Sequence, residues 1–145
     1  MKRKKQNEGG WTFLETLIVI TIIFLLPGSI GFVGKKYIDS ARIATAKNEI
    51  SILMIALDSY YIDCKKYPTE QQGLKALWEK PVSAPIPNGW NGPYVTKDDF
   101  VDPWDFEYVY HNPGPENVPI EIITYGSDNT PGGEKNDEDI TSWKM

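Results

Sequence analysis

The chain has 145 residues, of which 41% are hydrophobic and 12% aromatic, enough for one domain with a real core. The single cysteine, Cys64, excludes an internal disulfide, and the single histidine, His111, excludes sites built on paired histidines. The net charge of −5 combines a basic stretch, residues 1–10, with an acidic remainder that carries 11 cations and 19 anions. Such an acidic body argues against nucleic-acid binding, whereas a basic start suits a membrane protein with a cytoplasmic amino terminus.

The first predicted element is a membrane-spanning helix over residues 11–34. Between Trp11 and Val33 the only ionisable residue is Glu15, and these residues would extend about 34 Å as a helix, which suffices to cross a bilayer. A discarded secretory signal is the alternative, but the apolar run is too long for one and no clean cleavage site follows it. Pro27 predicts a kink or local melting of the helix, unless it is a tolerated membrane proline.

After the membrane segment, apolar residues recur every three or four positions, so we expect the helix to continue to about Asp63 with one face on a core: Ala46, Ile50, Leu53, Leu57, Tyr60 and Tyr61. A short second helix is predicted from Thr69, its N-cap, with a stripe of Leu74, Leu77 and Trp78. Residues 81–93 are rich in proline and glycine and predict a loop. Residues 106–110 and 120–125 predict strands, followed by an acidic, glycine-rich tail.

The string most informative about function is Gly9-Gly10-Trp11-Thr12-Phe13-Leu14-Glu15, which leads into the apolar run. A carboxylate this close to lipid is costly unless it finds a cation. Cleavage after Gly10 would create an amine on Trp11, about 6 Å along the helix axis from Glu15, and staggered chains would bring the two charges together directly. On the residues alone, this pairing and a Glu15 that reaches the headgroup level are about equally supported.

The same string resembles the type III signal of type IV pilins and type II secretion pseudopilins. The resemblance implies that a prepilin peptidase cuts between Gly10 and Trp11 and methylates the new amino terminus, so that residues 1–10 are a leader. It also implies that Glu15 directs assembly. Trp11 stands where the family usually has phenylalanine or methionine, and Pro27 lies earlier than the proline common in these helices.

Three strings in the body narrow the resemblance: Lys66 to Leu77 (KYPTEQQGLKAL), Trp90 to Tyr94 (WNGPY), and Asp102 to Trp104 (DPW). They are similar to the major pseudopilin family of type II secretion, general secretion pathway protein G. Asp105 stands where that family usually has glycine. The resemblance implies an α+β, type IV pilin-like fold, in which a long amino-terminal helix packs on a small antiparallel sheet with a carboxy-terminal calcium loop. Residues 35–145 would then be a periplasmic domain.

The acidic segment between Tyr125 and Ile140 contains five carboxylates and one cation. As a bare pattern it is typical of a solvated acidic tail. The resemblance instead implies one structural Ca²⁺, which would close the loop in place of the disulfide of many pilins. By position its ligands would be the side chains of Asp128, Glu138 and Asp139 and the main-chain carbonyls of Tyr125 and Thr130, with Asp137 as the alternative to Glu138.

The function implied is that of a subunit, not an enzyme: a homopolymer forming a periplasmic pseudopilus that exports folded proteins across the outer membrane. Its partners would be the prepilin peptidase, minor pseudopilins and the inner-membrane assembly platform, and it would cross the inner membrane once. A type IV or competence pilin is the nearest alternative, against which the lone Cys64 speaks. A periplasmic enzyme would need partners for His111 that the sequence does not place near it, and an anchored calcium-dependent adhesin would not need Glu15.

Overall fold

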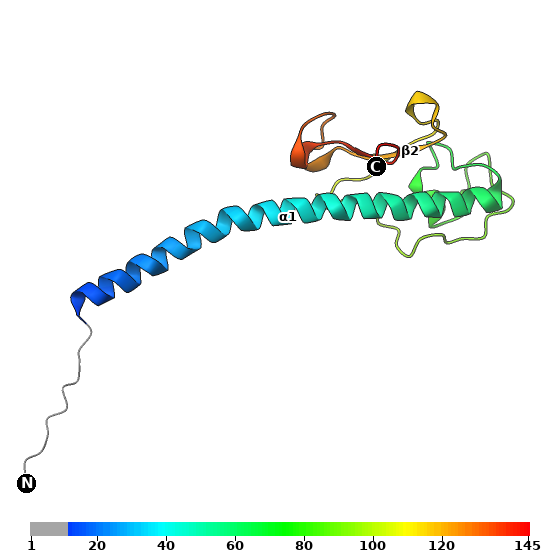
Figure 1. Cartoon of the computed structure of the whole chain (residues 1–145). Coiled ribbons are helices and arrows are strands. Elements are labelled where there is room, and N and C mark those ends of the chain that lie inside the picture. Colours follow the sequence, from blue (N-terminus) through cyan, green and yellow to red (C-terminus); the bar gives the residue numbers. More distant parts are fainter. Residues whose placement is uncertain (1–11) are drawn as a thin grey trace, which may run out of the picture. The chain divides into compact units, whose positions relative to one another are not determined.

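The computed structural model describes the backbone of residues 12–145, together with the side chains of these residues except residues 26–33 (Figure 1). The chain divides into two compact units, Met1–Ile38 and Asp39–Met145. The core and the sheet belong to the second unit.

The dominant element is α1, a single α-helix over Phe13–Cys64. Thr12 caps its start, because the Thr12 hydroxyl oxygen accepts a hydrogen bond from the Glu15 backbone N–H at 3.3 Å. The negative charge of Glu15 in the first turn also favours the helix amino terminus. The predicted long helix is therefore confirmed, with its end within one residue of the expected position. The helix is continuous through Pro27, so the local melting considered for that position is not found.

The predicted membrane segment is only partly described. Among the residues whose side chains are described, no helix is both long and apolar enough to cross a membrane. The segment, residues 11–34, includes Trp11 and residues 26–33, which lie outside that set. The membrane crossing therefore stays a prediction.

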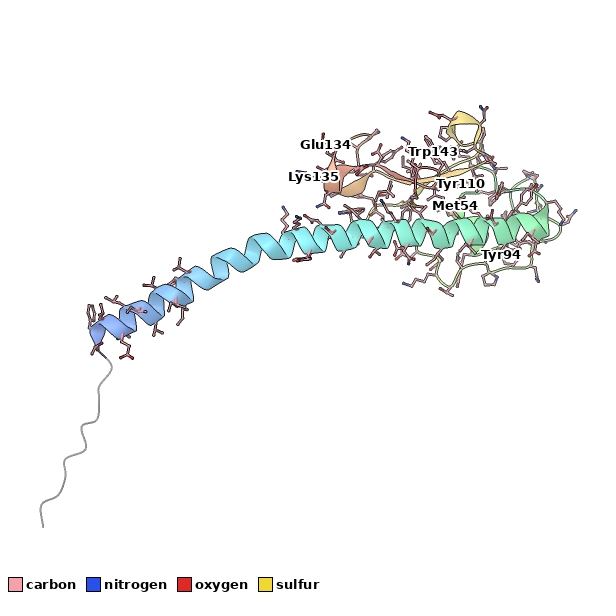
Figure 2. All side chains as sticks on the ribbon, viewed as in Figure 1. Met54, Tyr94, Tyr110, Glu134, Lys135 and Trp143 are labelled. Atoms are coloured by element: carbon pink, nitrogen blue, oxygen red, sulfur yellow. The ribbon has the colours of Figure 1, made fainter. Side chains whose placement is uncertain are left out.

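One face of α1 packs into the hydrophobic core of the second unit. Its apolar residues follow the three- and four-residue spacing of a helix face, and all are buried: Ala46, Ile50, Leu53, Ala56, Leu57 and Tyr60. Of the predicted face only Tyr61 is misplaced, because it is 45% exposed. The helix packs in one cluster with Trp104, Tyr108 and Tyr110. Figure 2 shows Tyr110 between the strands and α1, and Tyr94 on the other side of the helix.

The sheet is antiparallel and has the order β1-β2-β3, with β1 over Val109–His111, β2 over Glu121–Thr124 and β3 over Ile140–Thr141. Tyr110 pairs with Ile122, and Thr124 pairs with Ile140. The first strand is shorter than predicted, because residues 101 and 107 close a separate hairpin through a single bridge. The two-residue β3 was not predicted, since so short a strand has no periodicity to detect.

The second helix was predicted wrongly. Residues 70–73 form a turn, and only Leu74–Leu77 are helical, as the 3-10 helix η1. Thr69 does act as a cap, and it exchanges hydrogen bonds with Gln72: the Thr69 N–H donates to Gln72 Oε1 at 3.0 Å, and the Gln72 N–H donates to Thr69 Oγ1 at 3.2 Å. Gly73 has a φ of 58°, a left-handed conformation that prevents an α-helix from continuing through it. Further 3-10 turns cover Pro115–Asn117 (η2), Gly126–Asp128 (η3) and Lys135–Asp137 (η4).

The carboxyl end of α1 is closed by a residue in the left-handed conformation. Lys65 has a φ of 60°, and its N–H donates to the Tyr61 carbonyl at 2.8 Å. This geometry is the αL helix cap, a position that glycine usually occupies because it has no Cβ. The exposed Lys65 therefore holds a strained backbone conformation at the junction between α1 and the body.

We expect Lys65→Gly to stabilise the protein by up to about 1 kcal/mol, because glycine removes the left-handed strain at the helix cap. The measurement is the denaturant midpoint of the full-length chain in detergent. Lys66→Gly is the matched control and should destabilise, because Lys66 has no left-handed φ to relieve. Equal effects of the two substitutions would contradict the cap.

Candidate functional site

Of the amino-terminal string Gly9 to Glu15, the structure describes only the residues from Thr12 onward. Gly10 and Trp11 lie outside the described residues, so the predicted cleavage site and the pairing of its new amine with Glu15 remain predictions. The Glu15 side chain is exposed among apolar neighbours that are exposed as well. Neither of the ion pairs found among the described residues involves Glu15.

The acidic loop joins β2 to β3 and folds back on itself. A Cβ on Gly126 would lie 2.5 Å from the Asn136 carbonyl oxygen, and one on Gly133 would collide with the backbone of Asp137. Both glycines also have positive φ, at 69° and 89°. The segment that leaves β2 at Gly126 and the segment that returns to β3 through Asn136 and Asp137 are called the two limbs of the loop. Their backbones touch, which only glycine permits at these positions. Figure 2 shows Glu134 and Lys135 at the outer end of this loop.

The predicted calcium ligands occupy different settings in the loop. Asp128 accepts hydrogen bonds from the N–H of Thr130 at 3.1 Å and from its hydroxyl at 2.7 Å. Asp137 accepts one from the Ser127 hydroxyl, and Asp139 Oδ2 accepts one from the Gly132 N–H at 2.9 Å. The first two bonds close a local turn, and the others tie the limbs together.

Asp137 and Glu138, the two alternative calcium ligands near the end of the loop, differ in their exposure to solvent. The Glu138 side chain is exposed, whereas those of Asp137 and Asp139 are half-buried. In the described part of the chain, no three or more histidine, cysteine or acidic side chains gather in an arrangement that could hold a metal. The predicted carboxylates are thus brought into one loop but not into one cluster.

Two oxygens in this loop are nevertheless buried and unpaired. Asn136 Oδ1 and Asp139 Oδ1 are inaccessible to solvent, and neither receives a hydrogen bond from the residues described. A buried acceptor without a partner costs about 1–3 kcal/mol. Oxygens of this kind are the donors that a hard cation such as Ca²⁺ prefers.

The start of the acidic loop is connected by hydrogen bonds to a buried carboxylate, Asp102, which belongs to the Asp-Pro-Trp string. Asp102 is 3% exposed and accepts hydrogen bonds from the Trp104 N–H at 2.9 Å and the Phe106 N–H at 3.0 Å. It also accepts one from the Thr124 hydroxyl, whose oxygen in turn accepts one from the Gly126 N–H at 3.2 Å. Asp102 therefore positions the hairpin, the end of β2 and the first residue of the loop together.

A second hydrogen bond ties the hairpin to α1. The Tyr108 hydroxyl donates to a Glu49 carboxylate oxygen at 2.7 Å. Burial raises the pKa of the Tyr108 phenol, and the hydrogen bond to Glu49 raises it further. Tyr108 therefore stays protonated as a donor throughout the physiological range.

The single histidine and the single cysteine of the chain lie in different settings. His111 Nδ1 lies 2.7 Å from a Glu70 carboxylate oxygen, and both side chains are substantially exposed. Burial raises the pKa of the Cys64 thiol, which is the opposite of what activates a cysteine nucleophile.

We expect Asp102→Asn to destabilise the protein by about 2 kcal/mol, because the amide accepts weaker hydrogen bonds and turns one donor toward other donors. The measurement is the denaturant midpoint of the full-length chain in detergent. Glu107→Gln, at an exposed position of the same hairpin, is the control and should change stability by less than about 0.5 kcal/mol. An Asp102→Asn effect as small as the control would show that the carboxylate does not organise this region.

Comparisons with known proteins agree over nearly the whole chain. A family model described as "Type II secretion system (T2SS), protein G" matches residues 35–143. The type II secretion system core protein G of Pseudomonas aeruginosa is 36% identical over 143 residues, which cover 99% of each chain. The core protein G of Escherichia coli K12 is 35% identical over 145 residues, covering 99% of this chain and 96% of the relative.

The fold is similar to a solved structure as well. The crystal structure of the major pseudopilin from the type 2 secretion system of enterohaemorrhagic Escherichia coli matches with a TM-score of 0.64 and 33% sequence identity. The match covers 78% of this chain and 94% of the solved chain. The long helix, the small antiparallel sheet and the family match together confirm the predicted type IV pilin-like fold. The chain belongs to the type II secretion system protein G family.

Proposed function

We propose that the chain is the major pseudopilin of a type II secretion system and polymerises into a periplasmic pseudopilus that drives the export of folded proteins across the outer membrane. The observation that carries this proposal is the nearly end-to-end alignment with core protein G relatives. The fold supports it, because the solved structure it matches is itself a major pseudopilin.

A polymerising role also suits the exposed start of α1. Between Phe13 and Leu25 the large apolar side chains are exposed, and they lie all around the helix. A helix that is apolar all round needs an apolar environment. We infer that lipid surrounds this segment in the unassembled subunit and that other copies of the chain surround it in the filament. The basic leader stays in the cytoplasm and the body lies in the periplasm.

Processing and assembly then become linked through charge. A prepilin peptidase would cut between Gly10 and Trp11 and methylate Trp11, which supplies a cation at the level of Glu15. The carboxylate of Glu15 lies exposed among apolar side chains, so its pairing with the amine of a neighbouring copy would set the axial register. Minor pseudopilins and the inner-membrane assembly platform are the proposed partners in this step.

We expect Glu15→Gln to abolish polymerisation while leaving processing intact, because it removes the charge and preserves the size of the side chain. The measurement is the polymer recovered from cells after chemical cross-linking, with mass spectrometry of the amino terminus as the readout of processing. The mature chain should begin at a methylated Trp11 in both proteins, and Glu116→Gln in the body is the matched control. Wild-type polymer from Glu15→Gln would favour an anchored, non-polymerising protein.

We also propose that the acidic loop holds one structural Ca²⁺. The buried, unpaired Asp139 Oδ1 supports this, and so does the backbone contact that already closes the loop. The candidate ligands are the side chains of Asp128, Asp137 and Asp139 and the carbonyls of Tyr125 and Thr130. The half-buried Asp137 is the better candidate, and the exposed Glu138 the poorer one. When bound, the ion would offset the repulsion between the loop carboxylates and hold the two limbs together.

Calcium should raise the thermal midpoint of the full-length chain in detergent, compared with the same protein in excess chelator. At a free calcium concentration of 100 times Kd, binding to the folded state alone adds about 2.7 kcal/mol. Magnesium is the control and should have little effect, because it demands a smaller octahedral site and gives up its waters reluctantly. Identical midpoints in calcium and chelator would contradict the metal site.

A further inference from the structure

We propose that the face of α1 opposite the core, between Ala41 and Ile62, is the surface on which the amino-terminal part of α1 from a second copy packs, with the two helices parallel and offset by 27 residues. This inference rests on the polymerisation proposed above. It adds the surface and the register through which two copies of the chain meet.

This face of α1 is mostly exposed, although it carries no charge. Its residues follow the spacing of a helix stripe and lie about half a turn away from the buried residues of α1: Ala41, Ala44, Thr45, Asn48, Ile52, Ile55, Ser59 and Ile62. The exposed fractions of its large apolar side chains are 52% for Ile52, 66% for Ile55 and 65% for Ile62. The solvent face of an amphipathic helix normally carries charged residues, so an uncharged stripe about 32 Å long indicates a surface that a partner covers.

The face continues into an apolar hollow beside Ile52. A cavity of about 400 Å³ opens between α1 and residues 94–103, with Thr45 and Ile52 among its lining residues from α1. Val95 and Phe100 line it from the other segment. An apolar side chain that approaches Ile52 from a second copy therefore finds further apolar surface to contact.

The start of α1 supplies an occupant that matches this face. Because 27 residues make about 7.5 helical turns, residues n and n+27 of two parallel helices in the same orientation point toward each other. The facing pairs are Leu14 with Ala41, Leu17 with Ala44, Ile18 with Thr45, Thr21 with Asn48, and Leu25 with Ile52. Large side chains meet small ones in the first three pairs, which permits close packing.

The central pair matches in polarity as well. The Thr21 hydroxyl already donates to the Leu17 carbonyl at 2.7 Å, so its oxygen is available to accept a hydrogen bond from the Asn48 amide. Asn48 is the only amide on the uncharged face, and this offset gives it a polar partner in place of an apolar one.

Charges at the end of the contact favour this offset over its neighbours. At 27 residues Lys35 of one copy lies level with Ile62 of the other, next to Asp63, and neither Lys35 nor Asp63 belongs to an ion pair among the described residues. An offset one turn longer would bring Lys35 beside Lys65 and Lys66, which repel it. An offset one turn shorter would place the apolar Leu25 against the Asn48 amide.

The first test measures the register by cross-linking. Leu25→Cys and Ile52→Cys are combined in the full-length chain with Cys64→Ser, and cells that make the polymer are treated with a mild oxidant. Leu25→Cys with Asn48→Cys is the register control, because residue 48 lies about 6 Å farther along the axis. A disulfide needs Cα atoms within about 7 Å, so the first pair should give at least about fivefold more cross-linked multimers than the control pair.

The second test places a charge on the face. Ile55→Lys should reduce the polymer recovered from cells by about tenfold or more, because packing would bury the ammonium without a partner. It should leave the thermal midpoint of the full-length chain in detergent unchanged, because Ile55 is 66% exposed in the single chain. Val82→Lys, at a position 91% exposed outside α1, is the matched control and should assemble like the wild type.

The outcomes separate this inference from the proposed function. If the wild-type chain forms no polymer, the proposed function is wrong, and this inference with it. If the wild type polymerises but Leu25→Cys with Ile52→Cys cross-links no more than the control pair, the register is wrong. Normal assembly of Ile55→Lys, or a loss of polymer that accompanies a lower thermal midpoint, would overturn the assignment of the face. A cross-linked product whose mass is not a multiple of the chain would show another protein there and would overturn the choice of a second copy.

Discussion

The buried carboxylate of Asp102 is the interaction on which the arrangement of the body depends. It receives hydrogen bonds from two backbone N–H groups of its own hairpin and from the Thr124 hydroxyl at the end of β2. The Thr124 hydroxyl oxygen in turn accepts a hydrogen bond from the N–H of Gly126, where the acidic loop begins. A charge at 3% exposure is tolerated only because these donors replace water. One side chain therefore joins the segment that packs on α1 to the segment that would hold the metal.

The two proposed functional regions have one property in common, since each presents carboxylates that form no ion pair with the residues that the structure describes. Glu15 is exposed on an apolar helix surface, and the acidic loop keeps the Asp139 and Asn136 oxygens buried without partners. In the first region the missing charge would come from the processed amino terminus of another copy, and in the second from Ca²⁺. Both regions would be completed only by something outside the single folded chain. This is consistent with a subunit that matures through processing, metal binding and assembly.

The elements predicted best were those with a clear period or a specific motif. The core face of α1 was identified almost completely, because its residues repeat every three or four positions over several turns. The second helix was predicted from sound capping chemistry, and Thr69 and Gln72 do exchange hydrogen bonds. It failed at Gly73, whose φ of 58° interrupts the α-helix before Leu74. β3 and the hairpin at residues 101–107 depend on distant partners and were not identified.

The residues alone were enough to predict the family, the long helix, the charge difference between residues 1–10 and the rest of the chain, and the position of the acidic loop. These features follow from composition, periodicity and short motifs, which are local properties of the chain. The tertiary structure is needed to know which loop oxygens are buried: the Oδ1 atoms of Asn136 and Asp139 are inaccessible to solvent, whereas the Glu138 side chain is exposed. Burial depends on the close approach of Gly126 to Asn136, ten residues away in the chain. Adjacent acids in a sequence are equivalent until the fold gives each a different environment.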